Sequence, residues 1–246
     1  MDNTSLDLSN IKSWKNNAIK FINKHVPVNR IKKIDFECID PHDMNWVNII
    51  YNYDINVIEL FVEFINTEYK YIKSFHGTRT DNINSFSQKG IVKPSYKDME
   101  DKAKKIFNNR DFPELDQNKL DKAIKESRKY KVGTIYFNLQ ENFLTDTDFS
   151  ADHYITFGSE HIQSIAANLG NGYKEKLKDC GKPFILECNI PMELVQLTNL
   201  EQISSFMLYE IFNADCDEKI RLKDSDVSIE LQKTLPSIFI VNIKSI

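Results

Sequence analysis

One short segment, Phe75-His76-Gly77-Thr78-Arg79, combines residue types that can bind the sugars and phosphates of a nucleotide. A Gly directly after a His lets a ligand approach bare backbone, because Gly carries no side chain. Thr78 and Arg79 add a hydroxyl and a cation, and we expect them at the beginning of a helix, where amide dipoles favour anions such as a pyrophosphate. We predict one wall of a nucleotide pocket here; the alternatives are a core histidine and an exposed cation.

A second segment, Tyr154-Ile155-Thr156-Phe157-Gly158-Ser159, has the pattern of a strand, small residues and then a helix over residues 160–169. Its aromatic side chains offer faces on which a flat ring can stack. The strand-like Thr134-Ile135-Tyr136-Phe137 has the same character. Either Tyr154 or Tyr136 could therefore supply a stacking ring.

A carboxylate late in the chain would complete such a site. Glu218 directly precedes the strand-like Lys219-Ile220-Arg221-Leu222, and Glu210 lies on the predicted helix before it. The alternative for Glu218 is a surface acid that heads an edge strand. His161 begins a predicted helix without an identifiable partner, and we interpret it as structural.

Hydrophobic periodicity indicates the elements that must position these residues. It predicts amphipathic helices over residues 8–26 and 55–69, a strand at 71–76, a short helix from Asp81 that Gly90 ends, two exposed helices within 95–131, a helix at 202–212, and strands at 183–190, 219–222 and 237–243. This order predicts an α+β fold. We expect a helical N-terminal segment over residues 1–69 and a catalytic domain over 70–246, with 95–131 as a charged helical insertion.

The chain resembles the ADP-ribosyltransferases of the His-Tyr-Glu type, the branch that includes poly(ADP-ribose) polymerases and diphtheria toxin. The resemblance covers about residues 71–246 and rests on the order of its motifs: Phe75-His76-Gly77-Thr78-Arg79, Lys89-Gly90-Ile91, the Tyr154 segment, the strand from Phe184 to Ile190, and the late acid. The family order favours Tyr154 over Tyr136, because the helix after Tyr154 is followed by the Phe184 strand. The resemblance implies a split β-sandwich core with NAD in its cleft.

The resemblance also implies roles for individual residues. His76 would hold a ribose hydroxyl, the backbone of Gly77 would bond the nicotinamide carboxamide, and Tyr154 would stack on the nicotinamide ring. Glu218 would bond the nicotinamide ribose and stabilise its oxocarbenium-like centre. Further contacts with NAD are expected from Phe75, Thr78, Arg79, Tyr136, Phe157 and Ser159. We expect no metal, because the positively charged nicotinamide is already a good leaving group.

The composition narrows the class of protein. With 41% hydrophobic and 11% aromatic residues, the 246-residue chain can bury a substantial core, and its net charge of -4 argues against a protein basic over its whole surface. The four cysteines, Cys38, Cys180, Cys188 and Cys216, lack zinc-site spacing and are expected as buried thiols. The N-terminus has no signal-peptide pattern, and the apolar stretch at 57–65 is too short for a membrane span. We therefore expect a soluble, cytoplasmic protein.

These observations predict an NAD-dependent ADP-ribosyltransferase that modifies a macromolecular acceptor, either protein or RNA/DNA. A bacterial intracellular toxin or anti-phage effector fits the family and the size, and a neutralising antitoxin protein is an expected partner. Lys12, Lys15, Lys20 and Lys24 share the polar face of the first helix, which is interpreted as a solvated face or a phosphate-contacting patch. The alternatives are an NAD glycohydrolase and a catalytically inactive module that binds ADP-ribose or a partner.

Overall fold

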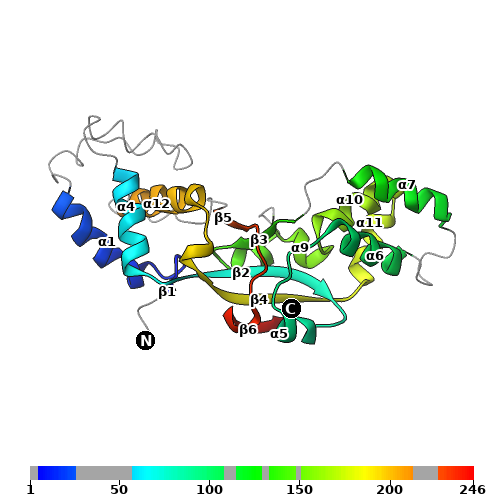
Figure 1. Ribbon diagram of the computed structural model, residues 1–246, viewed down its shortest axis with the longest axis horizontal. Helices are drawn as coiled ribbons and strands as arrows, with labels where there is room; N and C mark the ends of the chain where they lie inside the picture. The colour runs from blue at the N-terminus through cyan, green and yellow to red at the C-terminus, as the bar shows by residue number, and fades with distance from the viewer. Residues whose placement is uncertain (1–4, 26–56, 108–114, 129–132, 148–150, 213–226) are drawn as a thin grey trace. The chain divides into compact units, whose positions relative to one another are not determined.

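The computed structural model of the chain describes residues 5–25, 57–107, 115–128, 133–147, 151–212 and 227–246 (Figure 1). These residues form a mixed α and β structure with several helices and one six-stranded sheet, as an α+β fold requires. The strands are β1 (Ser5–Leu6), β2 (Tyr71–Thr80), β3 (Ile135–Asn138), β4 (Lys182–Pro191), β5 (Ser228–Leu231) and β6 (Ile240–Ser245). None of the helices in these ranges is long and apolar enough to cross a bilayer.

The sheet has the strand order β5-β3-β2-β4-β6, and β1 pairs with β2 off this path. β2 and β3 are antiparallel, with Phe75 opposite Asn138. β4 and β6 are also antiparallel, with a register shift between Glu187 and Cys188, whereas the short β1 is parallel to β2. Non-consecutive strands are therefore neighbours. β2 lies beside β4 at the centre of the sheet, and β5, late in the chain, lies beside β3 at one edge.

The helices follow the apolar periodicity of the sequence closely. They are α1 (Ile11–His25), α4 (Val57–Glu68), α5 (Asn84–Lys89), α6 (Tyr96–Phe107), α7 (Gln117–Ser127), α8 (Asn142–Thr145), α9 (His153–Thr156), α10 (Glu160–Leu169), α11 (Tyr173–Lys176) and α12 (Leu197–Phe212), with 3-10 turns at Leu177–Asp179, Met192–Leu194 and Ser237–Phe239. The predicted helices over 8–26, 55–69, 160–169 and 202–212 are confirmed, with ends that differ by a few residues. The predicted strand at 219–222 lies outside the described residues.

The chain divides into two compact units, each built from two segments of the sequence. The first contains Met1–Lys73 and Asn189–Ile229, and the second contains Ser74–Cys188 and Glu230–Ile246. The break after residue 73 is close to the predicted boundary at 69/70. The later segment joins the N-terminal helices because α12 packs against α4.

In the first unit, one face of α1 is buried along its length. Trp14, Ala18 and Ile22 recur every four residues and are at most 2% exposed. The ring of Phe21 lies 4.8 Å from that of Phe64 and 5.7 Å from that of Phe61, both on α4. The spacing of apolar side chains on both helices thus produces an aromatic contact between them.

In the second unit, α6, α7 and α10 lie together (Figure 1). Their side chains bury a common core. Its members include Phe107, Leu120, Ile162 and Ile165, each at most 2% exposed. The two helices predicted within 95–131 are confirmed, but they are exposed on one face only. Their few apolar residues share one helix face and pack on α10, while the charged residues occupy the other face.

Two local predictions near the candidate site are also wrong. Residues 75–79 lie inside β2, which continues to Thr80, and α5 begins only at Asn84, so the segment does not form a strand-to-helix turn. Residues 153–156 form the short helix α9 instead of a strand. The backbone N–H groups of Tyr154 and Thr156 donate to the carbonyls of Ala151 and Asp152, so local turn bonds override the β propensity of the sequence.

Gly90 ends α5 in a conformation that suits only Gly. Its φ is +75°, and a Cβ at this position would lie 2.0 Å from the carbonyl oxygen of Leu235. We expect Gly90→Ala to lower the free energy of unfolding by about 2–4 kcal/mol, since left-handed strain adds to a backbone overlap. Gly172→Ala is the matched control, because φ there is +88° and no atom lies within 4 Å of the added Cβ. Equal losses in urea denaturation of the two variants would contradict this account.

Candidate functional site

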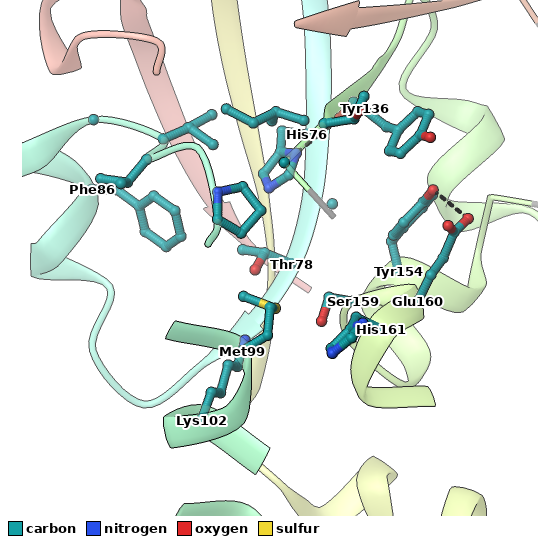
Figure 2. Close-up of a pocket in the computed structure, with 18 of the residues that line it drawn as sticks. His76, Thr78, Phe86, Met99, Lys102, Tyr136, Tyr154, Ser159, Glu160 and His161 are labelled. Carbon is teal, nitrogen blue, oxygen red and sulfur yellow. Dashed lines mark hydrogen bonds between the residues drawn. The ribbon is translucent and has the colours of Figure 1, made fainter. Parts of the chain in front are cut away.

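A cavity of about 310 Å³ lies within the second unit, with walls supplied by β2, β3, α5, α6 and the beginning of α10 (Figure 2). This volume is at the lower end of the range for small-molecule sites. The predicted site residues that line it are His76, Gly77, Thr78, Tyr136, Tyr154 and Ser159. Segments that are far apart in the sequence therefore meet around one cavity.

His76 projects from β2 to the centre of the view in Figure 2. Its Nδ1 lies 2.9 Å from the carbonyl oxygen of Tyr136 on the neighbouring strand. Because a carbonyl only accepts hydrogen bonds, Nδ1 carries the proton, and Nε2 is left as an acceptor. Burial lowers the pKa of His76, and the charge of Lys102 lowers it further, so the ring is neutral at pH 7. A neutral acceptor of this kind suits a ribose hydroxyl.

The lowered pKa of His76 predicts how stability depends on pH. Below about pH 6.5 the unfolded chain binds a proton that the folded chain does not, so stability is lost as pH falls, by at most about 1.4 kcal/mol per pH unit for one group. We expect the thermal midpoint to fall between about pH 7.5 and pH 5.5, and to fall less in His76→Gln, which cannot titrate. The same slope in both proteins would show that His76 titrates normally.

Two tyrosines face one another at one side of the cavity. The rings of Tyr136 on β3 and Tyr154 on α9 have centroids 6.4 Å apart and planes only 25° from parallel. The two tyrosines that the sequence predicted as alternatives therefore line the cavity together, and we call the space that their rings line the aromatic slot.

Glu160, a residue that the sequence did not single out, holds Tyr154 in place. The Tyr154 hydroxyl donates to Glu160 Oε1 over 2.7 Å, and His153 Nε2 lies 3.5 Å from the same oxygen (Figure 2). Contacts with His153 and Tyr154 lower the pKa of the Glu160 carboxyl. The carboxylate is therefore ionised at neutral pH and orients a tyrosine that lines the cavity.

Gly77 has a steric function that the sequence does not reveal. A Cβ at this position would lie 2.8 Å from Leu144 Cδ2, 3.1 Å from Ile155 Cγ2 and 3.2 Å from Tyr154 Cβ. The missing side chain thus lets α9 approach β2 closely. Because α9 carries Tyr154, Gly77 helps to place the aromatic slot beside His76.

Three predicted contact residues do not line the cavity. Arg79 donates hydrogen bonds to the carbonyls of Ile155 at 2.9 Å, Cys180 at 3.1 Å and Gly181 at 2.8 Å, and also to that of Lys178. These bonds fix the segment after α11 and the end of α9, so the guanidinium is a structural anchor. Phe75 is buried with Phe143, Leu144 and Ile185, and the Phe157 ring lies below the ammonium groups of Lys174 and Lys178 at 4.6 and 5.2 Å.

The structure draws attention to an acid that the sequence analysis missed. Glu218 lies outside the described residues, and Glu210 lies on α12 in the first unit. Glu230 is on β5, the strand next to β3, and it alternates with buried Ile229 and Leu231. After burial, the charge of Glu230 is the largest cause that raises the pKa of Tyr136. A carboxylate is therefore within electrostatic reach of the aromatic slot, although Glu230 itself does not line the cavity.

No protein-family model matches the chain, and no curated protein or solved structure is significantly similar to it. Within the described ranges, no group of three or more His, Cys, Asp or Glu side chains is arranged to hold a metal ion. The chemistry of the cavity residues is thus what bears on function. They combine a neutral histidine, a pair of tyrosines and a nearby ionised acid.

Proposed function

We propose that the chain is an NAD-dependent ADP-ribosyltransferase that modifies a macromolecular acceptor, protein or nucleic acid. The observation that carries the proposal is the placement of three residues on adjacent strands: His76 on β2, Tyr136 on β3 and Glu230 on β5. Tyr154 stacks with Tyr136 at one side of the cavity. This set fits the His-Tyr-Glu pattern, with Glu230 in the position that Glu218 was expected to fill.

The aromatic slot is the proposed nicotinamide site. Tyr136 and Tyr154 sandwich the planar ring, and Glu160 keeps the Tyr154 ring in its orientation through the 2.7 Å hydrogen bond. His76 accepts a hydrogen bond from a ribose hydroxyl at Nε2, because its Nδ1 proton is committed to the Tyr136 carbonyl. These contacts fix the nicotinamide and its ribose relative to each other.

We assign the late acid of the pattern to Glu230, which does not line the cavity and acts on it through its charge. Its carboxylate stabilises the positive charge that develops on the ribose as the bond to nicotinamide breaks, which is the electrostatic demand that carboxylates also meet in glycoside hydrolysis. Nicotinamide leaves as a neutral molecule with the electron pair of that bond. A nucleophilic atom of the acceptor then bonds the ribose carbon and releases its proton, and transfer requires that water be kept from the same carbon.

The fate of the ADP-ribose distinguishes transfer to an acceptor from simple hydrolysis of NAD. We expect that purified protein, incubated with adenylate-labelled NAD and cell lysate, transfers label to either the protein or the nucleic-acid fraction. Label only in free ADP-ribose, with nicotinamide released at full rate, would identify an NAD glycohydrolase. NAD binding without release of nicotinamide would favour an inactive binding module. A toxin or anti-phage role, with a neutralising antitoxin partner, belongs to the same proposal.

A further inference from the structure

One end of the cavity holds polar groups that the proposed reaction does not use. Lys102 of α6 approaches it from one side, and Ser159 and His161 lie at the beginning of α10 (Figure 2). α6 and α10 pack on the same hydrophobic core, which fixes the three side chains relative to one another. Together they supply a hydroxyl, an imidazole and a cation.

His161 is the most deeply buried of the three, at 8% exposure, and it lines the cavity. Its Nδ1 is buried and has no hydrogen-bond partner among the described residues. Its Nε2 lies 3.4 Å from Ser127 Oγ, which itself donates to the Ile124 carbonyl over 2.7 Å. Nε2 therefore carries the proton that donates to Ser127, and Nδ1 remains for a group inside the cavity. A buried polar atom without a partner is costly, so a ligand that pairs with it gains affinity.

Ser159 immediately precedes the ten-residue helix α10, and its backbone is extended, as in an N-cap. Its hydroxyl makes no capping bond, and Oγ is buried without a partner among the described residues. The amides of the first turn of a helix have no partner within the helix and favour an anion. The free hydroxyl and the helix terminus thus present donors to the same space.

Lys102 supplies the positive charge. Its pKa is lowered, and burial is the cause; no carboxylate in the described parts of the chain offsets it. Its charge also lowers the pKa of His76, so the ammonium is within electrostatic reach of the centre of the cavity. An unpaired, desolvated ammonium is unfavourable unless an anion binds next to it.

We propose that Lys102, Ser159 and His161 form a phosphate-binding subsite that holds the pyrophosphate of the dinucleotide, an identity that rests on the proposed function. Glu160 does not oppose the anion, because its carboxylate is engaged by Tyr154 and His153 on the aromatic side of the cavity. The subsite is built partly from α6, within the 95–131 segment. The charged insertion therefore completes the cofactor cavity.

The subsite also takes up a proton when it is filled. Burial lowers the pKa of His161, and the charge of Glu100, which pairs with Arg128, acts in the opposite direction. The ring contacts Ser127 Oγ at Nε2 and the ring of Tyr96, and Lys102 and Glu160 line the same cavity. A phosphate next to Nδ1 favours the imidazolium, which then donates to it. We expect NAD binding to take up protons at pH 7.5, measured by calorimetry in two buffers of different ionisation enthalpy.

Calorimetry with three probes tests the subsite: NAD, nicotinamide riboside, which has no phosphate, and inorganic pyrophosphate. We expect Lys102→Met to weaken NAD and pyrophosphate about tenfold to a hundredfold, as loss of a charged hydrogen bond predicts, and to leave nicotinamide riboside within about twofold. Ser159→Ala should weaken the same two probes by a smaller factor. Lys105→Met is the matched control, because Lys105 is an exposed lysine on the same helix.

Two results would overturn the subsite. One is equal affinity for NAD in Lys102→Met and Lys105→Met, and the other is a loss of affinity for nicotinamide riboside in Lys102→Met as large as the loss for NAD. Lys102→Met removes a charge but keeps a long side chain, so it should not leave a void. A thermal midpoint within about 2 °C of the wild type shows that the variant is folded. If the wild type binds pyrophosphate through Lys102 but releases no nicotinamide from NAD, the subsite stands and the proposed function fails. If nicotinamide is released with the same KM in Lys102→Met, the function stands and the subsite fails.

Discussion

Glu230→Gln is expected to reduce the rate of nicotinamide release from NAD by roughly 10²- to 10³-fold, while the affinity for NAD changes by less than about threefold. The substitution preserves the size of the side chain and removes only its charge. That charge already acts on the site, since it raises the pKa of Tyr136. The loss should therefore appear in kcat and not in KM, because the carboxylate interacts with charge that develops only as the bond breaks.

Two other carboxylates serve as controls for this assignment. Glu218→Gln tests the acid expected from the sequence, and Glu160→Gln tests the acid that accepts a hydrogen bond from the Tyr154 hydroxyl. We expect each to retain nicotinamide release within about tenfold, a loss well below that of Glu230→Gln. Single-turnover rates for the three variants distinguish them. Full activity in Glu230→Gln together with loss in Glu218→Gln would move the catalytic acid to residue 218.

Tyr154→Ala is expected to weaken NAD binding by about tenfold to a hundredfold, because stacking of a flat ring on an aromatic side chain contributes about 1–3 kcal/mol. Tyr136 and Tyr154 are stacked, so the substitution removes one of the two rings that line the slot. Tyr154→Phe keeps the ring and loses only the hydroxyl that donates to Glu160, so its affinity should stay within about fivefold of the wild type.

Quenching of tyrosine fluorescence by bound NAD gives both affinities directly. Loss of binding in Tyr154→Phe as severe as in Tyr154→Ala would show that the hydroxyl, and not the aromatic face, carries the interaction. Unchanged affinity in Tyr154→Ala would place the planar ring elsewhere. Either outcome would remove the aromatic slot from the account.

The elements of the fold with long, regular periodicity could be predicted from the sequence. The apolar stripes of α1 and α4 and the strands β2 and β4 are where the pattern predicts them. The sequence did not predict that one face of α6 and of α7 is buried, because a few apolar residues suffice to bury a helix face once a partner such as α10 is present. The pairing of distant strands, β5 with β3 for example, depends on tertiary contacts that no local pattern contains.

The candidate site was predicted at its histidine end and less well elsewhere. His76, Tyr154 and Tyr136 line one cavity, although Tyr154 reaches it from a helix. The structural role of Arg79 could not be predicted from the sequence around it. The four carbonyls to which it donates follow it by about 75 residues or more in the chain. Glu230 lies in the short strand Ser228-Ile229-Glu230-Leu231, in which apolar and polar residues alternate. This alternation could have predicted an acid on a half-exposed strand face.

Release of nicotinamide from NAD by the purified 246-residue chain tests the central claim most directly. Chromatography of the reaction should show nicotinamide formed at a rate that falls by more than about a hundredfold in Glu230→Gln, and the remaining ADP-ribose should be recovered on an acceptor from lysate. The wild type and Lys105→Met should behave alike. Absence of nicotinamide release from a folded wild-type protein that binds NAD, with every lysate fraction present, would contradict the assignment as a transferase.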